Sequence, residues 1–137
     1  MSFTTPGTEA YVDTSAFIAL RERADAYHTQ FSRLFSHPPR LITSALVIAE
    51  GHTWFLRRHG PERALQFLDL ISRLEMLAVR AFDEDEIAVA EGVVKRFSDQ
   101  NLTLADAHGL AIMAERRTKI CWSTDRHLSL TGVPLAV

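Results

Sequence analysis

The fold is decided by a short stretch near the N-terminus, Ala10-Tyr11-Val12-Asp13-Thr14-Ser15. Its three apolar residues predict a short buried strand, and Asp13 or Thr14 is suited to cap a helix that runs to about Arg21. An aspartate beside core sequence is costly unless it is hydrogen-bonded, paired or bound to a cation. The stretch therefore predicts a strand followed by a helix, with an acid at the junction.

The same alternation of strand and helix continues along the chain. Further strands are predicted at Leu41–Ile42, Met76–Val79, Lys119–Trp122 and, as a short edge strand, Val133–Leu135. Helices are predicted to end near Phe35, Leu56, Leu74, Phe97 and Arg117. This order predicts an α/β fold, a three-layer α/β/α sandwich with a mainly parallel central sheet. Because no linker or repeat interrupts it, residues 1–137 are expected to form a single domain.

The composition is that of an ordinary soluble globular protein. Of the 137 residues, 47% are apolar and 23% are charged, which is enough for one full core. No stretch approaches the roughly 20 apolar residues of a membrane span, and Met1–Glu9 lacks the apolar core of a signal peptide. The single cysteine, Cys121, is expected to be a buried thiol. These features favour a cytoplasmic protein without a membrane partner.

Three further carboxylates stand, like Asp13, where an apolar run meets a polar break. They are Glu50, Asp106 and Asp125. Ligands of parallel α/β folds bind beyond the carboxyl ends of the strands, where Asp13 and Asp125 fall. Helices that start at the same edge would bring Glu50 and Asp106 toward it. The four acids therefore predict a pocket for a hard divalent cation.

Each acid also has a structural explanation of its own. Asp13 is suited to an N-cap, and Thr103 with Asp106 resembles a capping box that has aspartate in place of glutamate. Asp125 is suited to cap a short turn at 126–128, and Glu50 is within reach of Arg57 or Arg58 on the same helix. A single metal site would explain all four acids at once. The structural explanations would instead require four separate coincidences.

The net charge of −2 does not by itself indicate a nucleic-acid partner. The basic residues are grouped, however, and a basic rim around an acidic pocket would suit a phosphodiester substrate. The groups are Arg21 and Arg23, then Arg57 and Arg58, then Arg116, Arg117 and Lys119. Any one of them is equally typical of a solvated surface. The acidic run Asp83–Glu86 is predicted to be the solvated first turn of a helix.

Four motifs carry a resemblance to a known family. In order, they are Tyr11-Val12-Asp13-Thr14-Ser15-Ala16, Glu50-Gly51-His52-Thr53 leading to Arg57-Arg58-His59-Gly60, Leu102-Thr103-Leu104-Ala105-Asp106-Ala107, and Ser123-Thr124-Asp125-Arg126-His127. In order and spacing they resemble the PIN-domain nucleases, and most closely the VapC-type toxins of toxin–antitoxin pairs. The chain departs from the family at Ala105, where Thr or Val is frequent, and at Leu128, where Phe is common. Both positions indicate packing rather than chemistry.

The resemblance implies a site and an activity. The family's metal-binding acids correspond to Asp13, Glu50, Asp106 and Asp125, and its hydroxyl near the first acid corresponds to Thr14 or Ser15. Arg126 is a further candidate for a phosphate contact. The implied activity is Mg²⁺- or Mn²⁺-dependent endoribonuclease cleavage of a tRNA or ribosomal RNA by the toxin of a type II toxin–antitoxin system. The implied partners are a small cognate antitoxin and a second copy of the chain in a homodimer.

Two alternatives share the same residues. The first is a catalytically weak PIN-like module that binds RNA or an antitoxin, and the second is a nuclease directed at DNA. Trp54, Phe55, Phe67 and Leu68 are candidates for an apolar groove or a dimer face, although about half of such positions are expected to be core. The histidines show no zinc-site spacing, and His52, His108 and His127 are expected to have packing or surface roles.

Overall fold

The computed structural model describes residues 9–137, and its centre is a four-stranded parallel sheet. The strands are β1 (Glu9–Val12), β2 (Arg40–Ser44), β3 (Leu77–Arg80) and β4 (Ile120–Trp122). Their order in the sheet is β3-β2-β1-β4, and every pairing is parallel. The predicted parallel sheet is therefore confirmed. The expectation that Met1–Glu9 lacks the apolar core of a signal peptide falls almost wholly on residues outside the described part of the chain.

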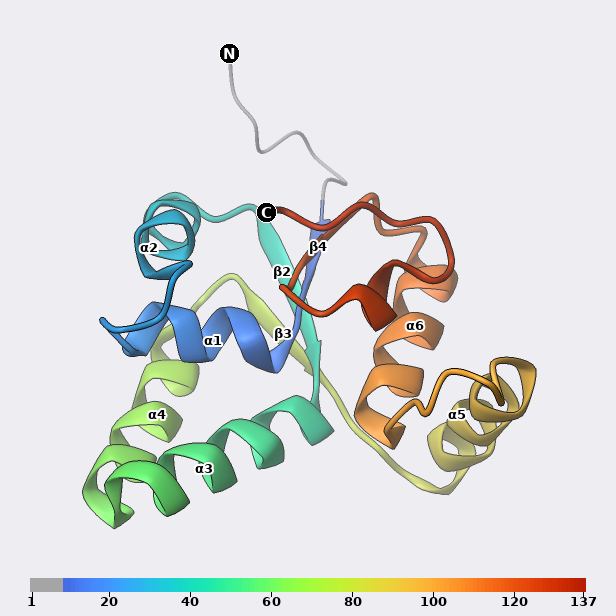
Figure 1. The fold of residues 1–137 in the computed structure, drawn as a ribbon, viewed down its shortest axis with the longest axis horizontal. Helices are drawn as coiled ribbons and strands as arrows, with labels where there is room; N and C mark the ends of the chain where they lie inside the picture. Colours follow the sequence, from blue (N-terminus) through green and yellow to red (C-terminus); the bar gives the residue numbers. More distant parts are fainter. Residues whose placement is uncertain (1–8) are drawn as a thin grey trace.

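Within residues 9–137, six α-helices and one 3₁₀ helix accompany the sheet. They are α1 (Thr14–Arg21), α2 (His28–Ser36), α3 (Ala45–His59), α4 (Pro61–Arg73), α5 (Glu84–Arg96), α6 (Leu104–Arg116) and η1 (Arg126–Ser129). Figure 1 shows α1 to α4 on one side of the strands and α5 and α6 on the other. This arrangement is the predicted three-layer α/β/α sandwich.

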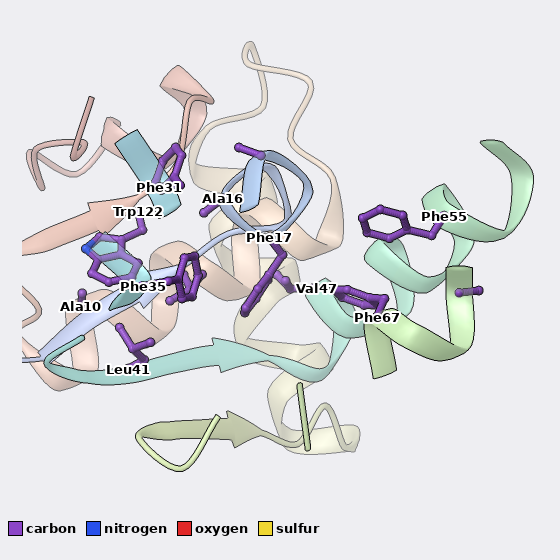
Figure 2. Close-up of a cluster of buried hydrophobic side chains, with 13 residues drawn as sticks. Ala10, Ala16, Phe17, Phe31, Phe35, Leu41, Val47, Phe55, Phe67 and Trp122 are labelled. Atoms are coloured by element: carbon purple, nitrogen blue, oxygen red, sulfur yellow. The ribbon is translucent and has the colours of Figure 1, made fainter. Parts of the chain in front are cut away.

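Alternation along β1 divides the core between the two faces of the sheet. Ala10 and Val12 point to the face covered by α1 to α4, where they meet a cluster that includes Phe17, Phe35 and Trp122 (Figure 2). The Phe35 and Trp122 rings meet edge to face, with centroids 4.9 Å apart. Because successive side chains of a strand point to opposite faces, this register fixes which layer each helix joins.

The opposite face of the sheet packs against α6 and the C-terminal segment. Tyr11 and Ile42 point to this side, where they join a second buried cluster with Leu110, Met113 and Leu128. Cys121 belongs to the same cluster and is fully buried, as expected from its apolar neighbours. Leu128 lies in η1, so its burial holds that turn against α6.

The C-terminal edge strand is shorter than the sequence predicts. Only one parallel bridge forms, between Cys121 and Leu135. The backbone N–H of Cys121 donates to the Pro134 carbonyl at 2.9 Å, and the N–H of Ala136 donates to the Cys121 carbonyl at 2.8 Å. Pro134 has no N–H to offer a longer ladder, so pairing does not extend beyond this point.

Among residues 9–137, no helix is both long enough and apolar enough to cross a membrane.

A glycine allows α3 and α4 to pack closely. Gly51 is buried on α3, and a Cβ atom at this position would lie 2.4 Å from the end of the Phe67 ring on α4. Phe67 itself stacks on Phe55 with ring centroids 5.3 Å apart, so it has little freedom to move. The close approach of these two helices therefore requires a residue without a side chain at position 51.

This contact gives a stability prediction. Gly51→Ala should lower the free energy of unfolding by about 1–3 kcal/mol, because the added methyl overpacks the α3–α4 contact. Gly92→Ala is the matched control on α5, where an added Cβ meets nothing within 4 Å. It should raise stability by about 0.5–1 kcal/mol through helix propensity. Urea unfolding measures both variants, and equal effects of the same sign would contradict the packing account.

Candidate active site

The strand order creates a crevice at one end of the sheet. The chain passes from β1 to β2 on one side of β1, and later returns to β4 on the other side. In open parallel sheets, ligands bind at such a reversal, beyond the carboxyl ends of the strands. The backbone N–H of Asp13 donates to the Trp122 carbonyl at 3.0 Å, which fixes Asp13 at the end of β4 as well as β1.

All four predicted acids lie in one pocket at this end of the sheet. The pocket has a volume of about 340 Å³. Its lining residues are Asp13, Thr14, Ser15, Ile18, Glu50, Trp54, Thr103, Asp106 and Asp125. Acids from α3, α6 and the segments after β1 and β4 therefore converge, as the sequence predicts, although they are up to 112 positions apart.

Asp13 is buried, and serine hydroxyls hold its carboxylate in place. Its Oδ2 accepts hydrogen bonds from Ser123 Oγ at 2.8 Å and from Ser15 Oγ at 3.1 Å. Asp13 occupies the N-cap position of α1, but within residues 9–137 its side chain makes no capping hydrogen bond. Burial raises the pKa of Asp13 above its ordinary value, and the bond from Ser123 opposes that rise. Asp13 is therefore the N-cap residue that the sequence predicts, but serine hydroxyls rather than a capping bond hold its carboxylate.

Glu50 lies at the rim of the pocket and is held by a hydroxyl from α1. Thr14 Oγ1 donates to Glu50 Oε1 at 2.8 Å. In the described part of the chain Glu50 forms no ion pair with Arg57 or Arg58, so that alternative is wrong. Loss of solvation raises the pKa of Glu50, and the negative charges of the other three acids raise it further.

Asp106 and Asp125 combine a capping role with a place in the pocket. Asp106 N donates to Thr103 Oγ1 and Thr103 N donates to Asp106 Oδ2, both at 3.1 Å, so the predicted capping box is confirmed. Asp125 caps η1 by accepting from His127 N at 3.0 Å. A cap uses only part of a carboxylate's accepting capacity, so these two structural roles do not compete with cation binding.

The candidate substrate residues are only partly in the pocket. Thr14 and Ser15 line it, and both hydroxyls touch acids within it. Arg126 is exposed on η1 and is outside the lining of the pocket. Substrate contacts by Thr14, Ser15 and Arg126 stay predictions.

The structure adds His127 to the site, although the sequence predicts a packing or surface role for this residue. His127 Nδ1 lies 3.5 Å from Asp106 Oδ2 and 3.6 Å from Asp125 Oδ1. The only sequence signal for this position is its spacing, two residues after Asp125 in a predicted turn. His108 has the expected packing role, since it is fully buried and its ring nitrogens contact Ser44 Oγ at 2.6 Å and Glu86 Oε1 at 3.1 Å.

A larger, mainly apolar groove adjoins the acidic pocket. It has a volume of about 950 Å³ and shares Glu50, Trp54 and Thr103 with the pocket. Its other lining residues are Leu46, Ala49, Thr53, Arg57, Arg58, Leu104 and Ala105. The guanidinium of Arg58 lies 5.3 Å from the centre of the Trp54 ring. Phe55 and Phe67 are instead buried in the core, so the prediction of a groove is confirmed only for Trp54.

The basic rim around the pocket is smaller in the structure than the sequence predicts. Arg57 and Arg58 line the groove, but Arg116 lies at the opposite end of α6, about 15 Å from Asp106 at 1.5 Å per residue. There it forms two hydrogen bonds with Glu9, of 2.7 and 2.9 Å. The acidic run after β3 is also only partly solvated, because Glu86 contacts Arg80 at 3.0 Å and the buried His108.

The donor set fits a divalent cation. Asp13 and Glu50 both carry raised pKa values, and the charges of neighbouring acids contribute to each shift. A hard cation with oxygen ligands would relieve both the lost solvation and the repulsion. The fold is that of an α/β protein. The pocket at the end of its sheet is an acidic site of the kind that binds a metal ion.

Residues 10–133 match the PIN domain family model, so the chain belongs to the PIN domain family. A curated relative is the 23S rRNA-specific endonuclease VapC20 of Mycobacterium tuberculosis, strain H37Rv. It is 29% identical over 123 residues, which are 89% of this chain and 93% of the relative. The crystal structure of M. tuberculosis VapC20, described as a sarcin-ricin loop cleaving toxin, superposes with a TM-score of 0.80. The two sequences are 26% identical, and the match covers 90% of this chain and 95% of that chain.

More distant structures share the fold alone. A toxin–antitoxin complex from Klebsiella pneumoniae matches with a TM-score of 0.61 and 19% identity, over 92% of this chain and 94% of that chain. VapBC2 from Rickettsia felis, bound to a promoter DNA fragment, also gives a TM-score of 0.61, at 15% identity, over 93% of this chain and 97% of that chain.

The buried acid predicts a pH-dependent stability of the metal-free protein. Because burial raises the pKa of Asp13, the folded state binds more protons than the unfolded state in the pH range between the two pKa values. Stability therefore falls as the pH rises through that range. Asp13→Asn removes this ionisation, so in EDTA the stability of the variant relative to the wild type should rise as the pH rises above about 4, the ordinary pKa of an aspartate.

Thermal unfolding across this pH range measures the gain. The control is Asp69→Asn on the exposed surface of α4, where Asp69, as far as residues 9–137 are concerned, pairs only with Arg73, at 3.2 Å. Its effect should stay within about 0.5 kcal/mol at every pH. A constant difference between Asp13→Asn and the wild type would contradict the assignment of a raised pKa to Asp13.

Proposed function

We propose that this chain is a metal-dependent endoribonuclease and the toxin of a type II toxin–antitoxin system. The observation that carries the proposal is the convergence of Asp13, Glu50, Asp106 and Asp125 in one pocket. Membership of the PIN domain family and the likeness to the endonuclease VapC20 support it. Residues 1–137 would then form one catalytic domain that acts in the cytoplasm, where its RNA substrate is found.

The chain's own groups would divide the work at the site. Asp13 and Asp106 are the principal metal ligands, and Glu50 and Asp125 bind through water or orient the attacking water. Mg²⁺ or Mn²⁺, when bound, supplies a Lewis acid for the phosphoryl oxygens and lowers the pKa of a bound water. Ser15 and Ser123 hold Asp13 in its rotamer, and Thr14 does the same for Glu50. Thr14 or Ser15 can also donate to a phosphate oxygen at the rim of the pocket.

Ribosomal RNA is the proposed substrate, with tRNA as the second choice. VapC20 is named for 23S rRNA and for cleavage of the sarcin-ricin loop, and it aligns with this chain over nearly its whole length. In the present chain, Arg57 and Arg58 stand in the groove beside the acids, where they can contact phosphates on either side of the scissile bond. Arg126 is proposed as a further phosphate contact.

Two protein partners belong to the proposal. A small cognate antitoxin would restrain the nuclease, and the apolar groove beside the acids offers it a surface continuous with the site. A homodimer is proposed because α3 and α4 expose Leu56, Leu65 and Leu68 close together in sequence. Light scattering should give the mass of a dimer for the purified chain, which is twice 15.4 kDa. A strict monomer at high protein concentration would contradict the proposed dimer.

RNA cleavage tests the proposed activity. Purified chain, freed of any bound antitoxin, is incubated with end-labelled RNAs that carry the sarcin-ricin loop, or with tRNAs, in Mg²⁺, Mn²⁺ or EDTA. Asp13→Asn and Asp106→Asn should each lower the cleavage rate at least about 100-fold, because each removes a charged ligand of the cation. Asp125→Asn should have a smaller effect, because it is proposed to act through water.

Asp69→Asn, on the surface of α4, is the matched control and should cleave at the wild-type rate. Site-specific cuts that need the metal and disappear in Asp106→Asn are the expected result. Folded protein that binds RNA but cuts none of it, with or without metal, would favour a PIN-like RNA-binding module instead. Cuts in DNA but not in RNA would redirect the proposal to a deoxyribonuclease.

A further inference from the structure

The acidic pocket has a nitrogen donor at its edge that the proposed carboxylate site does not include. His127 Nδ1 faces two of the four acids, at 3.5 Å from Asp106 Oδ2 and 3.6 Å from Asp125 Oδ1. Both separations exceed the 2.7–3.2 Å of a formed N–H···O hydrogen bond. The imidazole therefore lies within 3.6 Å of both carboxylates without a formed hydrogen bond from Nδ1 to either.

These three side chains have the spacing of metal ligands. One potential ligand atom from each of Asp106, Asp125 and His127 lies within 4.8 Å of the other two. In an octahedral site with metal–ligand distances of about 2.1 Å, adjacent ligand atoms are about 3.0 Å apart and opposite ones about 4.2 Å apart. The two separations from His127 Nδ1, of 3.5 and 3.6 Å, need to close by about half an ångström to reach the adjacent spacing.

The turn that carries the histidine is firmly anchored. His127 N donates to Asp125 Oδ1 at 3.0 Å, and Leu128 N donates to the Asp125 carbonyl at 3.1 Å. Leu128 is fully buried in the core between β4 and α6. Asp125 and His127 are thus presented together by one short turn, and Asp106 reaches them from the first turn of α6. This fixed presentation favours a shared ligand over a chance approach of a surface histidine.

We propose that His127 Nδ1 is a direct ligand of the divalent ion, beside the direct ligand Asp106 and with Asp125 bound through water, and gives the site a preference for Mn²⁺ over Mg²⁺. The inference rests on the metal site of the proposed function and deepens it. Mg²⁺ is a hard cation that takes oxygen ligands, whereas transition-metal ions also accept imidazole nitrogen. A mixed nitrogen and oxygen donor set therefore binds Mn²⁺ better than an all-oxygen set of the same charge would.

Pulsed electron paramagnetic resonance reads this coordination directly, without any RNA. The full-length protein is loaded with one equivalent of Mn²⁺, and electron spin-echo modulation from a directly bound ¹⁴N nucleus is recorded. The modulation should be present in the wild type and absent in His127→Gln. It should persist in His52→Gln, the matched control, since among residues 9–137 His52 on α3 belongs to no cluster of candidate metal ligands, whereas His127 does.

Ion affinity gives a second readout that a structural role would not produce. In His127→Gln the affinity for Mn²⁺ should fall about tenfold, while the affinity for Mg²⁺ should change less than about threefold. Calorimetric titration measures both ions on the same protein. The side chain is 35% exposed, so the variant is expected to fold, and circular dichroism with thermal unfolding checks that it does.

Three results would overturn the inference. The first is the absence of ¹⁴N modulation in wild-type protein that has bound Mn²⁺. The second is modulation that survives in His127→Gln. The third is an equal loss of affinity for both ions in that variant. None of these results would contradict the proposed nuclease, because each is compatible with a divalent ion bound by the four carboxylates without His127. Failure of the protein to bind any divalent ion would overturn the inference and the proposed metal site together.

Discussion

The constraint on which the rest of the structure depends is that four carboxylates share one pocket. They repel one another there and lose part of their solvation. Burial raises the pKa of Asp13, and both burial and neighbouring acids raise that of Glu50. The caps that Asp106 and Asp125 form do not require all four acids to share one pocket, and a cation is the simplest partner that relieves the cost of gathering them. The surrounding hydroxyls of Thr14, Ser15 and Ser123 hold the acids in place without neutralising them.

The sheet is what brings the acids together. β1 lies between β2 and β4, so the segments that leave β1 and β4 meet at the same edge. Two large clusters on opposite faces of β1 hold this register, since Val12 belongs to one and Tyr11 to the other. A slip of one residue would exchange the two faces and would move Asp13 out of the pocket. Core packing and site geometry are thus set by the same few residues.

The fold and the four acids were predictable because both depend on local patterns in the sequence. Apolar runs that end at Asp13 and Asp125 indicate parallel strands and the edge where ligands bind. The roles of individual side chains were harder to predict, since a capping residue such as Asp106 can also face a pocket. The place of His127 depends on how η1 docks against α6, and the distant place of Arg116 depends on the length and direction of α6. The docking of η1 does not follow from spacing along the chain, whereas the distance between Asp106 and Arg116 does follow once both are placed on one helix.

Anomalous diffraction from crystals soaked in Mn²⁺ tests the central claim most directly. The account predicts a manganese peak in the pocket between β1 and β4, within coordination distance of the carboxylates of Asp13 and Asp106. A matched crystal of Asp106→Asn should show that peak weakened or absent. A well-ordered pocket with no manganese, or manganese bound only elsewhere on the surface, would contradict the claim that these four acids form a metal site.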